Sequence, residues 1–390
     1  MRILLITDWN RGRGGAEDYI TWLRAGLRAA GDEVRLLTSS AGSAAAGTAE
    51  YVAFGSNRTA VQAFLQIANP FAFATVRRAL REFRPDAVVV NMFAHHLSPA
   101  LLMALRGWAV VLLVTDYKLI CPIGSKLLPN GSICEAKAGR VCYQSGCMSR
   151  PHWMRDRPRY ALIGSAMGNV TRVVTCSEWM RRALAADGIE SAVVLLPVPP
   201  PSPGYRRAPA SRPTFAYCGR LDVEKGVAML LRALARVREV VPQAALRIIG
   251  RGPLRTSLER LAAQLHIADS VTFTGWLDPP QIEQHLAEAW GLVVPSLWAE
   301  PLGLVAIQAI VHGVPVIASR SGGLAEVVEE DRSGLLFPNG AEEALTEQMV
   351  AIAESRAFPS HTLKTEVIDH ALKRHSIEAH IKKLRGLLVG

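Results

Sequence analysis

The feature that most constrains the fold is an alternation of apolar runs with amphipathic segments, which occurs twice along the chain. In the first half, runs of strand length lie at 3–6, 34–37, 87–90, 110–114 and 173–175, with helical patterns at 19–30 and 76–83. A stretch with seven prolines and no periodicity, 197–213, follows and is predicted to be a linker. The alternation then restarts, with strands at 214–217, 246–249, 271–273, 291–294 and 314–318 and helices at 226–240, 253–265 and 303–312. Such alternation favours parallel sheets covered by helices.

The interruption divides the chain into two α/β domains, and its 390 residues are enough for two cores. We expect two doubly wound Rossmann-like domains, 1–200 and 213–364, facing a central cleft at the carboxyl ends of their strands. Residues 365–388 have the pattern of one long amphipathic helix, and we expect 365–390 to cross back and pack on the N-terminal domain.

The charge of the chain is concentrated in its first half. Residues 1–205 hold 23 Lys/Arg against 14 Asp/Glu, whereas 206–390 hold 21 against 20. This asymmetry indicates an anionic partner or an anionic membrane surface, and an arginine-rich compositional bias explains it equally well. Nucleic acid is not an expected partner, because no helix-turn-helix or aromatic-interleaved basic motif occurs.

No targeting or membrane-spanning signal is found in the sequence. The start MRILLITD lacks a basic leader with an apolar core, and no window reaches the roughly 18 apolar residues of a membrane span. We therefore expect a cytoplasmic protein with reduced cysteines. Its basic half is also compatible with a peripheral position at the inner face of the membrane.

Glycine-rich and cationic corners follow several of the predicted strands. In TDWNRGRGGAEDY, Gly14 and Gly15 precede a helix and allow the close approach of a diphosphate, although a plain flexible turn is the alternative. In CGRLDVEKG, Gly219 and Arg220 end a strand and Lys225 begins a helix, so that two cations can clamp a diphosphate.

Each corner also has a simpler interpretation. A surface ion pair of Arg220 with Asp222 or Glu224 is the alternative to the clamp. The corner IIGRGP, with Gly250, lies at the same predicted sheet edge. No corner is specific alone, but together they favour a nucleoside-diphosphate site.

The stretch SLWAEPLGLVAIQAIVHGVPVIAS carries one acid, Glu300, ahead of an apolar helix that Gly303 opens. A helix N-terminus binds anions, because its first N–H groups are unpaired. A helix-capping acid is the simple interpretation of Glu300, and a ligand contact is the other. Eight residues further on, Gln308 lies roughly 80° away on a helix and can face the same pocket.

In this order and spacing, these stretches resemble the family-4 retaining glycosyltransferases of the GT-B fold over essentially the whole chain. The matching stretches are GGAEDY, FRPDAVVVN, TDYKLICP, CGRLDVEKG, IIGRGP, VTFTGWL and EPLGLVAIQAIVHGVPVIASRSGG followed by Glu326. The resemblance implies a metal-independent hexosyltransferase that needs no cofactor. It would move a sugar from a nucleoside-diphosphate sugar to a hydroxyl of a glycan, lipid-linked or small-molecule acceptor.

The resemblance also assigns roles to residues. Arg220 and Lys225 would hold the donor phosphates, amides at Gly303, Leu304 and Val305 the distal phosphate, and Glu300 the hydroxyls of the donor sugar. Together with Asp116, the residues Arg220, Lys225 and Glu300 form the expected catalytic set. Gly14 and Gly15 would let the first domain approach the diphosphate, and Gly219 and Gly250 complete the donor-binding set.

The sequence departs from the family pattern at two positions. Gln308 replaces the second glutamate, which normally accepts hydrogen bonds from the ribose, and its carbonyl can still accept them. Thr115 stands where relatives often have His, which leaves Asp116 with His95 or His96, and Tyr117, as acceptor-side candidates. For a lone histidine a structural role is the alternative.

Four cysteines, Cys121, Cys134, Cys142 and Cys147, lie in one loop without a Cys-x-x-Cys pair. Free thiols are favoured over a structural zinc site, because the spacing is atypical for zinc. We therefore expect no metal. The basic stretch PHWMRDRPRY, 151–160, is either a membrane or anionic-acceptor contact or a solvated helix face.

Two other functions keep the same architecture. One is a non-catalytic nucleotide-sugar sensor that has lost the acid at 308, and the intact Arg220, Lys225 and Glu300 argue against it. The other is a nucleotide-sugar epimerase, and a long acceptor-side loop around 121–159 argues against that.

Overall fold

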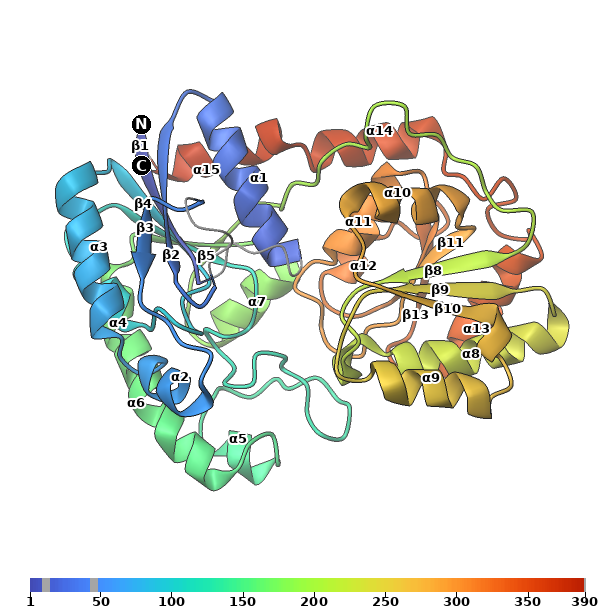
Figure 1. Ribbon diagram of the computed structural model, residues 1–390, viewed down its shortest axis with the longest axis horizontal. Helices are drawn as coiled ribbons and strands as arrows, with labels where there is room; N and C mark the ends of the chain where they lie inside the picture. The colour runs from blue at the N-terminus through green and yellow to red at the C-terminus, as the bar shows by residue number, and fades with distance from the viewer. Residues whose placement is uncertain (9–14, 43–47, 389–390) are drawn as a thin grey trace. The chain divides into compact units, whose positions relative to one another are not determined.

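The computed structural model describes residues 1–8, 15–42 and 48–388 (Figure 1). The chain forms two compact units, each built on one parallel sheet. Unit 1 comprises Met1–Pro197 and Ile377–Gly390, and unit 2 comprises Val198–Ser376. This is the α/β architecture with two Rossmann-like domains that the alternation predicts.

Unit 1 has a seven-stranded sheet in the order β3-β2-β1-β4-β5-β6-β7. Its strands are β1 (Arg2–Ile6), β2 (Glu33–Ser39), β3 (Tyr51–Ala53), β4 (Ala87–Asn91), β5 (Val110–Val114), β6 (Arg172–Thr175) and β7 (Ala192–Val193). Its helices are α1 (Gly15–Ala29), α2 (Thr59–Leu65), α3 (Pro70–Phe83), α4 (Ala100–Ala104), α5 (Val141–Gln144), α6 (Arg150–Ala166), α7 (Glu178–Ala186) and α15 (Ile377–Leu388). Strands β4 and β5 are buried at every position, as expected for strands covered on both faces.

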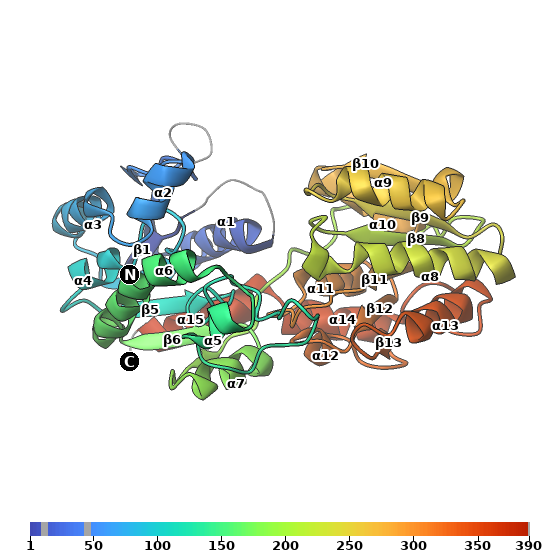
Figure 2. The same ribbon diagram turned by 90° about the horizontal axis from the view of Figure 1, so that it is seen from below.

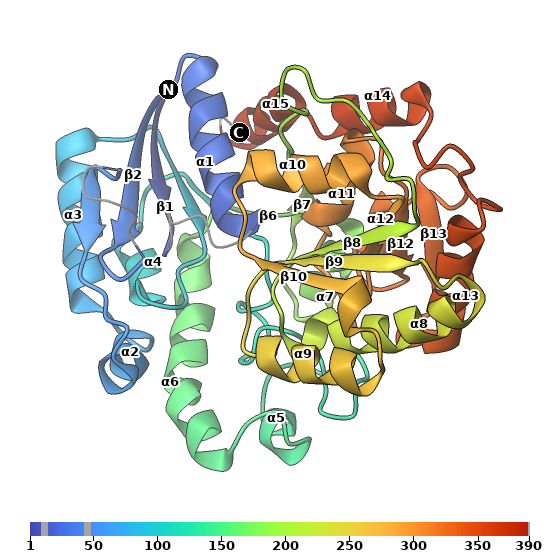
Figure 3. The ribbon, with the colours of Figure 1, turned by 45° about the vertical axis from the view of Figure 1, so that its right-hand side comes forward.

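Unit 2 has a six-stranded sheet in the order β10-β9-β8-β11-β12-β13. The strands are β8 (Thr214–Cys218), β9 (Ala245–Ile249), β10 (Val271–Gly275), β11 (Gly291–Val294), β12 (Val316–Ser319) and β13 (Gly334–Phe337). The helices are α8 (Val227–Val240), α9 (Arg255–Gln264), α10 (Pro279–Glu288), α11 (Leu304–Val311), α12 (Leu324–Val327), α13 (Glu342–Ala353) and α14 (Thr365–Arg374). Helices α8 and α13 lie side by side (Figure 2) on the face opposite to α10 and α11 (Figure 3).

Each sheet winds in both directions from its first strand. In unit 1, β1 pairs with β2 on one side and β4 on the other. In unit 2, β8 pairs with β9 and β11 in the same way. The carboxyl ends of β1 and β4, and of β8 and β11, are therefore the two topological switch points, where ligands bind in such sheets.

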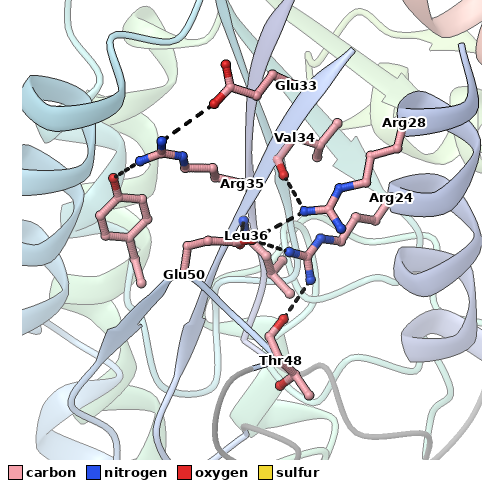
Figure 4. A network of polar contacts seen from close by, with 9 residues as sticks. Arg24, Arg28, Glu33, Val34, Arg35, Leu36, Thr48 and Glu50 are labelled. Carbon is pink, nitrogen blue, oxygen red and sulfur yellow. Dashed lines mark hydrogen bonds and ion pairs between the residues drawn. The ribbon is translucent and has the colours of Figure 1, made fainter. Parts of the chain in front are cut away.

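A polar cluster fixes α1 to the edge of the unit 1 sheet (Figure 4). Glu50, just ahead of β3, accepts hydrogen bonds from Arg24 at 2.5 Å, from Arg28 at 3.3 Å and from the backbone N–H of Leu36 at 2.7 Å. One carboxylate thus holds a helix and two strands together, which accounts for part of the arginine content without an external partner.

The long C-terminal helix predicted over 365–388 is wrong in one respect, because the structure has two helices there. Helix α14 ends at Arg374, and His375 leaves the helical conformation with φ −110° and ψ 25°. Ser376 then precedes α15, and serine favours the position before a helix. Only α15 belongs to unit 1, where Ile377 packs against Gly26 of α1.

The proline-rich stretch is also more ordered than a linker. Arg207 donates hydrogen bonds from its guanidinium to four backbone carbonyls of unit 2, among them Leu286 and His361. The backbone N–H groups of Ala208 and Ala210 bond to the carbonyls of Ala287 and Glu288. Composition predicted an irregular segment, but it did not show that this segment is fixed to the surface of unit 2.

Candidate functional site

The switch point of unit 2 is built on close contacts between glycine backbones. Gly219 follows β8 and donates its N–H to the Ile249 carbonyl at 3.0 Å. Gly250 follows β9 with φ +144°, and a Cβ atom there would lie 1.9 Å from the Gly219 carbonyl oxygen. Both glycines predicted as donor-binding thus lie at this sheet edge, and the structure gives Gly250 a packing requirement of its own.

An ion pair joins the two arms of this switch point. Lys225, in the loop after β8, places its Nζ 2.6 Å from Oε1 of Glu300, in the loop after β11. The same oxygen accepts a hydrogen bond from the hydroxyl of Ser296 at 2.6 Å. The ammonium of Lys225 also lies over the Trp298 ring, 4.9 Å from its centroid.

The environment of Glu300 keeps it ionised. Burial works against the charge of this 7% exposed side chain, but Lys225 and the hydrogen bonds outweigh burial and lower its pKa. A buried carboxylate that holds a cation is a ready acceptor for ligand hydroxyls when the cation turns to another partner.

The structure corrects how Glu300 relates to the following helix. Gly303 is the residue before α11, with φ +96°, and the helix begins at Leu304. Glu300 lies in a loop that forms a β-bridge with Gly322, so it is neither the helix cap nor on the helix. The expected 80° separation from Gln308 therefore does not apply, because it assumed a continuous helix from 300 to 308.

The first turn of α11 follows the Glu300 loop and has N–H groups without a partner in the described part of the chain. The N–H of Ala306 bonds to the Gly303 carbonyl at 2.9 Å, so Ala306 is the first residue of the helix whose amide is used. The amides of Leu304 and Val305 lie before it, at the open end of the helix. Gln308 is half-buried one turn further on. Its side chain forms no hydrogen bond with any other residue in the described part of the chain.

Arg220 forms the surface ion pairs that the sequence analysis gave as the alternative to a phosphate contact. Its guanidinium pairs with Asp222 at 2.9 Å and with Glu224 at 3.1 Å, and its side chain is 59% exposed. It shares a loop with Lys225 but does not contact Glu300. A ligand phosphate would have to compete with two carboxylates for it.

The switch point of unit 1 holds a carboxylate that the sequence analysis did not assign to the site. Asp8, after β1, is completely buried and accepts hydrogen bonds from the N–H groups of His95, His96 and Leu97 at 2.6, 2.9 and 2.8 Å. Burial raises its pKa to about 6 in spite of these bonds. An acid directly after the first strand was the available signal.

Asp116 and His95 line one pocket of unit 1, together with Thr115 and Lys118. Burial raises the pKa of Asp116, and the N–H of Lys118, 2.8 Å from its Oδ1, opposes that shift. Burial and the nearby cation of Lys118 lower the pKa of His95 to about 3, so this imidazole is neutral at pH 7. The structure thus brings Asp116 and His95 together in the lining of one pocket.

Two of the acceptor-side candidates are not placed to meet a ligand. Tyr117 is 1% exposed, and its hydroxyl accepts a hydrogen bond from the Trp179 indole at 3.0 Å. His96 has no exposed surface. Neither residue is among those that line the pocket, and both side chains are buried. Of the two glycines predicted near the donor, Gly15 begins α1, and Gly14 lies outside the described residues.

The cysteine loop contains free thiols, of which only Cys121 is buried. Burial raises the pKa of Cys147, and the neighbouring Cys134, Cys142 and Cys121 raise it further. Within the described residues, no three potential ligands are arranged to hold a metal ion. None of the helices in residues 1–8, 15–42 and 48–388 is long and apolar enough to cross a bilayer.

Two family models match the chain. Residues 14–200 match the family described as glycosyl transferase 4-like domain, and residues 205–365 match glycosyl transferases group 1. The two matches cover unit 1 and unit 2 in turn. The chain therefore belongs to the glycosyltransferases of the group 1, family-4-like type.

Curated relatives match part of the chain. A GDP-mannose-dependent α-(1-6)-phosphatidylinositol monomannoside mannosyltransferase of Mycolicibacterium smegmatis is 32% identical over 200 residues, which are 46% of this chain and 52% of the relative. The chain thus matches about half the length of such curated relatives.

Solved structures show the same two-domain fold. A sucrose-phosphate synthase of Thermosynechococcus elongatus superposes with a TM-score of 0.75 at 21% identity, covering 99% of this chain and 98% of that one. The Anabaena HepE protein in complex with UDP and glucose superposes with a TM-score of 0.73 at 18% identity, covering both chains completely.

Proposed function

We propose that this glycosyltransferase moves a hexose from a nucleoside-diphosphate sugar to an acceptor hydroxyl, with retention of anomeric configuration. The observation that carries the proposal is the Lys225–Glu300 ion pair at the switch point of unit 2, beside the N-terminus of α11. A cation, an anion and unpaired N–H groups at one sheet edge suit a ligand with both phosphates and sugar hydroxyls.

In this proposal the ion pair opens when the donor binds. Lys225 turns to the diphosphate, and Glu300, relieved of its partner, accepts hydrogen bonds from the sugar hydroxyls. The amides of Leu304 and Val305 bind the distal phosphate, and Arg220 leaves its two acids to join them. Positive charge is then in position before the glycosidic bond breaks and the diphosphate gains charge.

The acceptor is assigned to unit 1. Asp116 and the neutral His95 line its pocket and are the groups that can accept or position the proton of a hydroxyl. Side-chain cations at 220 and 225 supply the charge for which other transferases use a metal, so we propose metal-independent transfer.

A panel of nucleotide sugars tests the proposal. GDP-mannose and UDP-glucose belong in it, since relatives use a GDP donor or bind UDP. We expect release of a nucleoside diphosphate from one donor, undiminished by EDTA, and a transferred sugar whose anomeric configuration by NMR matches that of the donor. Binding without turnover would favour the sensor, and a changed sugar without transfer would favour the epimerase.

We also propose that unit 1 contacts an anionic membrane surface, at the inner face of the membrane, through one defined patch. Between Tyr51 and Arg81 the chain has four arginines and no acid. In the same segment Phe64 is 69%, Phe71 55% and Phe54 48% exposed, and α2 and α3 lie next to each other (Figure 3). Exposed aromatic rings flanked by arginines suit an interface of apolar chains and anionic headgroups.

Vesicle sedimentation tests this contact. We expect binding to vesicles that contain phosphatidylglycerol, and at least a fivefold lower bound fraction for Phe64→Ser/Phe71→Ser. The matched control is Trp276→Ser, which removes an exposed aromatic side chain from unit 2. Equal binding of all three proteins, or no binding of the wild type to these vesicles, would refute the contact.

A further inference from the structure

A buried arginine of unit 1 contacts an aromatic ring, that of Tyr160 at 5.7 Å from its centroid, but part of its guanidinium has no polar partner among the described residues. Arg159, on α6, is only 3% exposed, and its Nε and Nη2 atoms are covered without a hydrogen-bond partner in the described part of the chain. No carboxylate among those residues forms an ion pair with it, although Asp156 on the same helix pairs with Arg155.

The two unsatisfied atoms, Nε and Nη2, are bonded to the same guanidinium carbon. Nε–H and the outer N–H of Nη2 point the same way along one edge of the planar guanidinium, and this edge binds two oxygens of one oxyanion. A guanidinium cannot lose its proton to escape burial, so the charge persists and an unpaired edge is costly. The edge therefore has the geometry of an oxyanion site without the oxyanion.

The charge of Arg159 acts on three residues that line the acceptor-side pocket. After burial, the charge of Arg159 is the next influence that lowers the pKa of Lys118, and it also acts on His95 and Asp116. All three of those residues line the pocket. The next residue of α6, Tyr160, donates its hydroxyl to the Lys118 carbonyl at 3.1 Å, which fixes the helix against that segment.

Lys118 supplies a second cation that can be redirected. Its Nζ donates to the Pro122 carbonyl at 2.9 Å, a neutral acceptor that an anion can replace. Gly124 leaves room for the side chain, since a Cβ there would lie 2.8 Å from its Cε.

We propose that Arg159 and Lys118 bind a phosphate group of the acceptor substrate. The proposed function is needed only to say that this phosphate belongs to an acceptor; the site itself does not depend on it. The charge of Arg159 acts on Asp8 and Asp116, but neither acid forms an ion pair or hydrogen bond with it in the described part of the chain, so they do not already satisfy the arginine. Since the edge is covered, a small movement of the covering side chains must accompany binding.

Isothermal titration with inorganic phosphate tests the site without any transfer reaction. All titrations are done in a Lys225→Ala background, which removes a cation of the proposed donor site. We expect Arg159→Met to raise the dissociation constant at least tenfold, and Arg157→Met, which removes an exposed arginine from the same helix, to change it less than twofold. Equal constants for the two variants would mean an adventitious ion only.

A second variant guards against a folding defect. Arg159→Lys keeps the charge but loses the two-pronged edge, so we expect an intermediate affinity, about threefold weaker than with arginine. Unchanged affinity would refute the role of the edge. Because a buried unpaired charge is costly, Arg159→Met should not lower the melting temperature; a lower melting temperature with unchanged phosphate binding would make Arg159 a structural residue.

The source of the phosphate is decided by two further ligands. Glycerol 3-phosphate that binds in an Arg159-dependent manner assigns a soluble phosphomonoester. Vesicles with phosphatidylglycerol that bind in that manner, when glycerol 3-phosphate does not, assign a lipid headgroup. If neither does, the acceptor assignment is refuted. Phosphate binding without turnover of any nucleotide sugar would leave this site standing and remove the proposed function.

Discussion

The two switch points hold a buried carboxylate in opposite ways. In unit 1 the acid comes from the loop after the first strand, and three backbone N–H groups after β4 bind it. In unit 2 the acid comes from the loop after β11, and a lysine side chain after the first strand binds it. The pKa of Asp8 is raised to about 6 by burial, whereas that of Glu300 is lowered although burial opposes this.

The difference separates a fixed element from one that can open. Backbone N–H groups cannot turn away from Asp8 without unfolding the loop 95–97, so this carboxylate is part of the fold. Lys225 can rotate away from Glu300, so that pair can exchange its partners for those of a ligand. In both sheets the loops at the switch point therefore determine whether a buried carboxylate is held by the backbone or by a side chain that can move.

The largest expected effect is on turnover when Glu300 is changed. Glu300→Gln removes the charge that meets the sugar and leaves Lys225 without its counter-ion, so we expect turnover to fall on the order of 10²–10³. Lys225→Ala should cost a similar factor. Both are measured as kcat with the donor found in the panel.

Glu224→Gln is the matched control, since it removes an acid from the loop that carries Lys225 and leaves Glu300 in place, and its turnover should stay within threefold. A mild effect of Glu300→Gln, similar to that of Glu224→Gln, would make the ion pair structural. The proposed contrast with Asp8 would then be lost.

The next largest effect concerns the glycine contact at the switch point of unit 2. Gly250→Ala places a Cβ atom 1.9 Å from the Gly219 carbonyl oxygen at φ +144°. We expect a loss of about 2–4 kcal/mol in the free energy of unfolding, measured by urea denaturation. Gly386→Ala on α15, which meets nothing within 4 Å, should be neutral or stabilising. Equal stability of the two variants would show that the backbones have room to separate.

The third effect is a pH dependence of stability that Asp8 causes. Its folded pKa, about 6, lies above the ordinary aspartate value of 3.8, so the folded state binds the proton more tightly. The stability from this proton is complete below pH 3.8 and is lost as pH rises through 6. Between pH 5 and 7.5 the wild type should lose about 1.4 kcal/mol relative to Asp8→Asn, measured by denaturation at both pH values. A difference independent of pH would mean that Asp8 titrates normally.

Much of the fold was predictable because strands covered on both faces leave a strong apolar signal. The predicted helices 226–240 and 253–265 are α8 and α9 with boundaries shifted by one or two residues. The short edge strands β3 and β7 were missed, since three or two residues carry no pattern. The break at His375 was missed because the apolar periodicity continues through it, although Ser376 marked a helix start.

The site could be predicted where the backbone conformation requires glycine. It could not be predicted where side chains from distant parts of the sequence are in contact. Gly219 and Gly250 lie where the corners indicated. The direct contact of Lys225 with Glu300 could not be inferred from residues 75 positions apart. Arg159 was one of three arginines in a basic stretch, and no local pattern distinguishes the buried arginine from the two others.

The smallest expected effect is at Gln308. It tests whether α11 of unit 2 contributes a second side chain that can bind the donor. Its half-buried side chain has no hydrogen-bond partner in the described part of the chain, so it is available to a ligand at no cost to the fold. In the proposed function its carbonyl accepts a hydrogen bond from the ribose, and Gln308→Ala should weaken donor binding by about 0.5–1.5 kcal/mol with kcat nearly unchanged. Gln308→Glu, which carries the acid usual in the family, should bind the donor at least as well as the wild type. Both variants are compared by KM and kcat. A loss of kcat equal to that of Glu300→Gln would place Gln308 at the reacting sugar, and no change in either constant would remove it from the donor site.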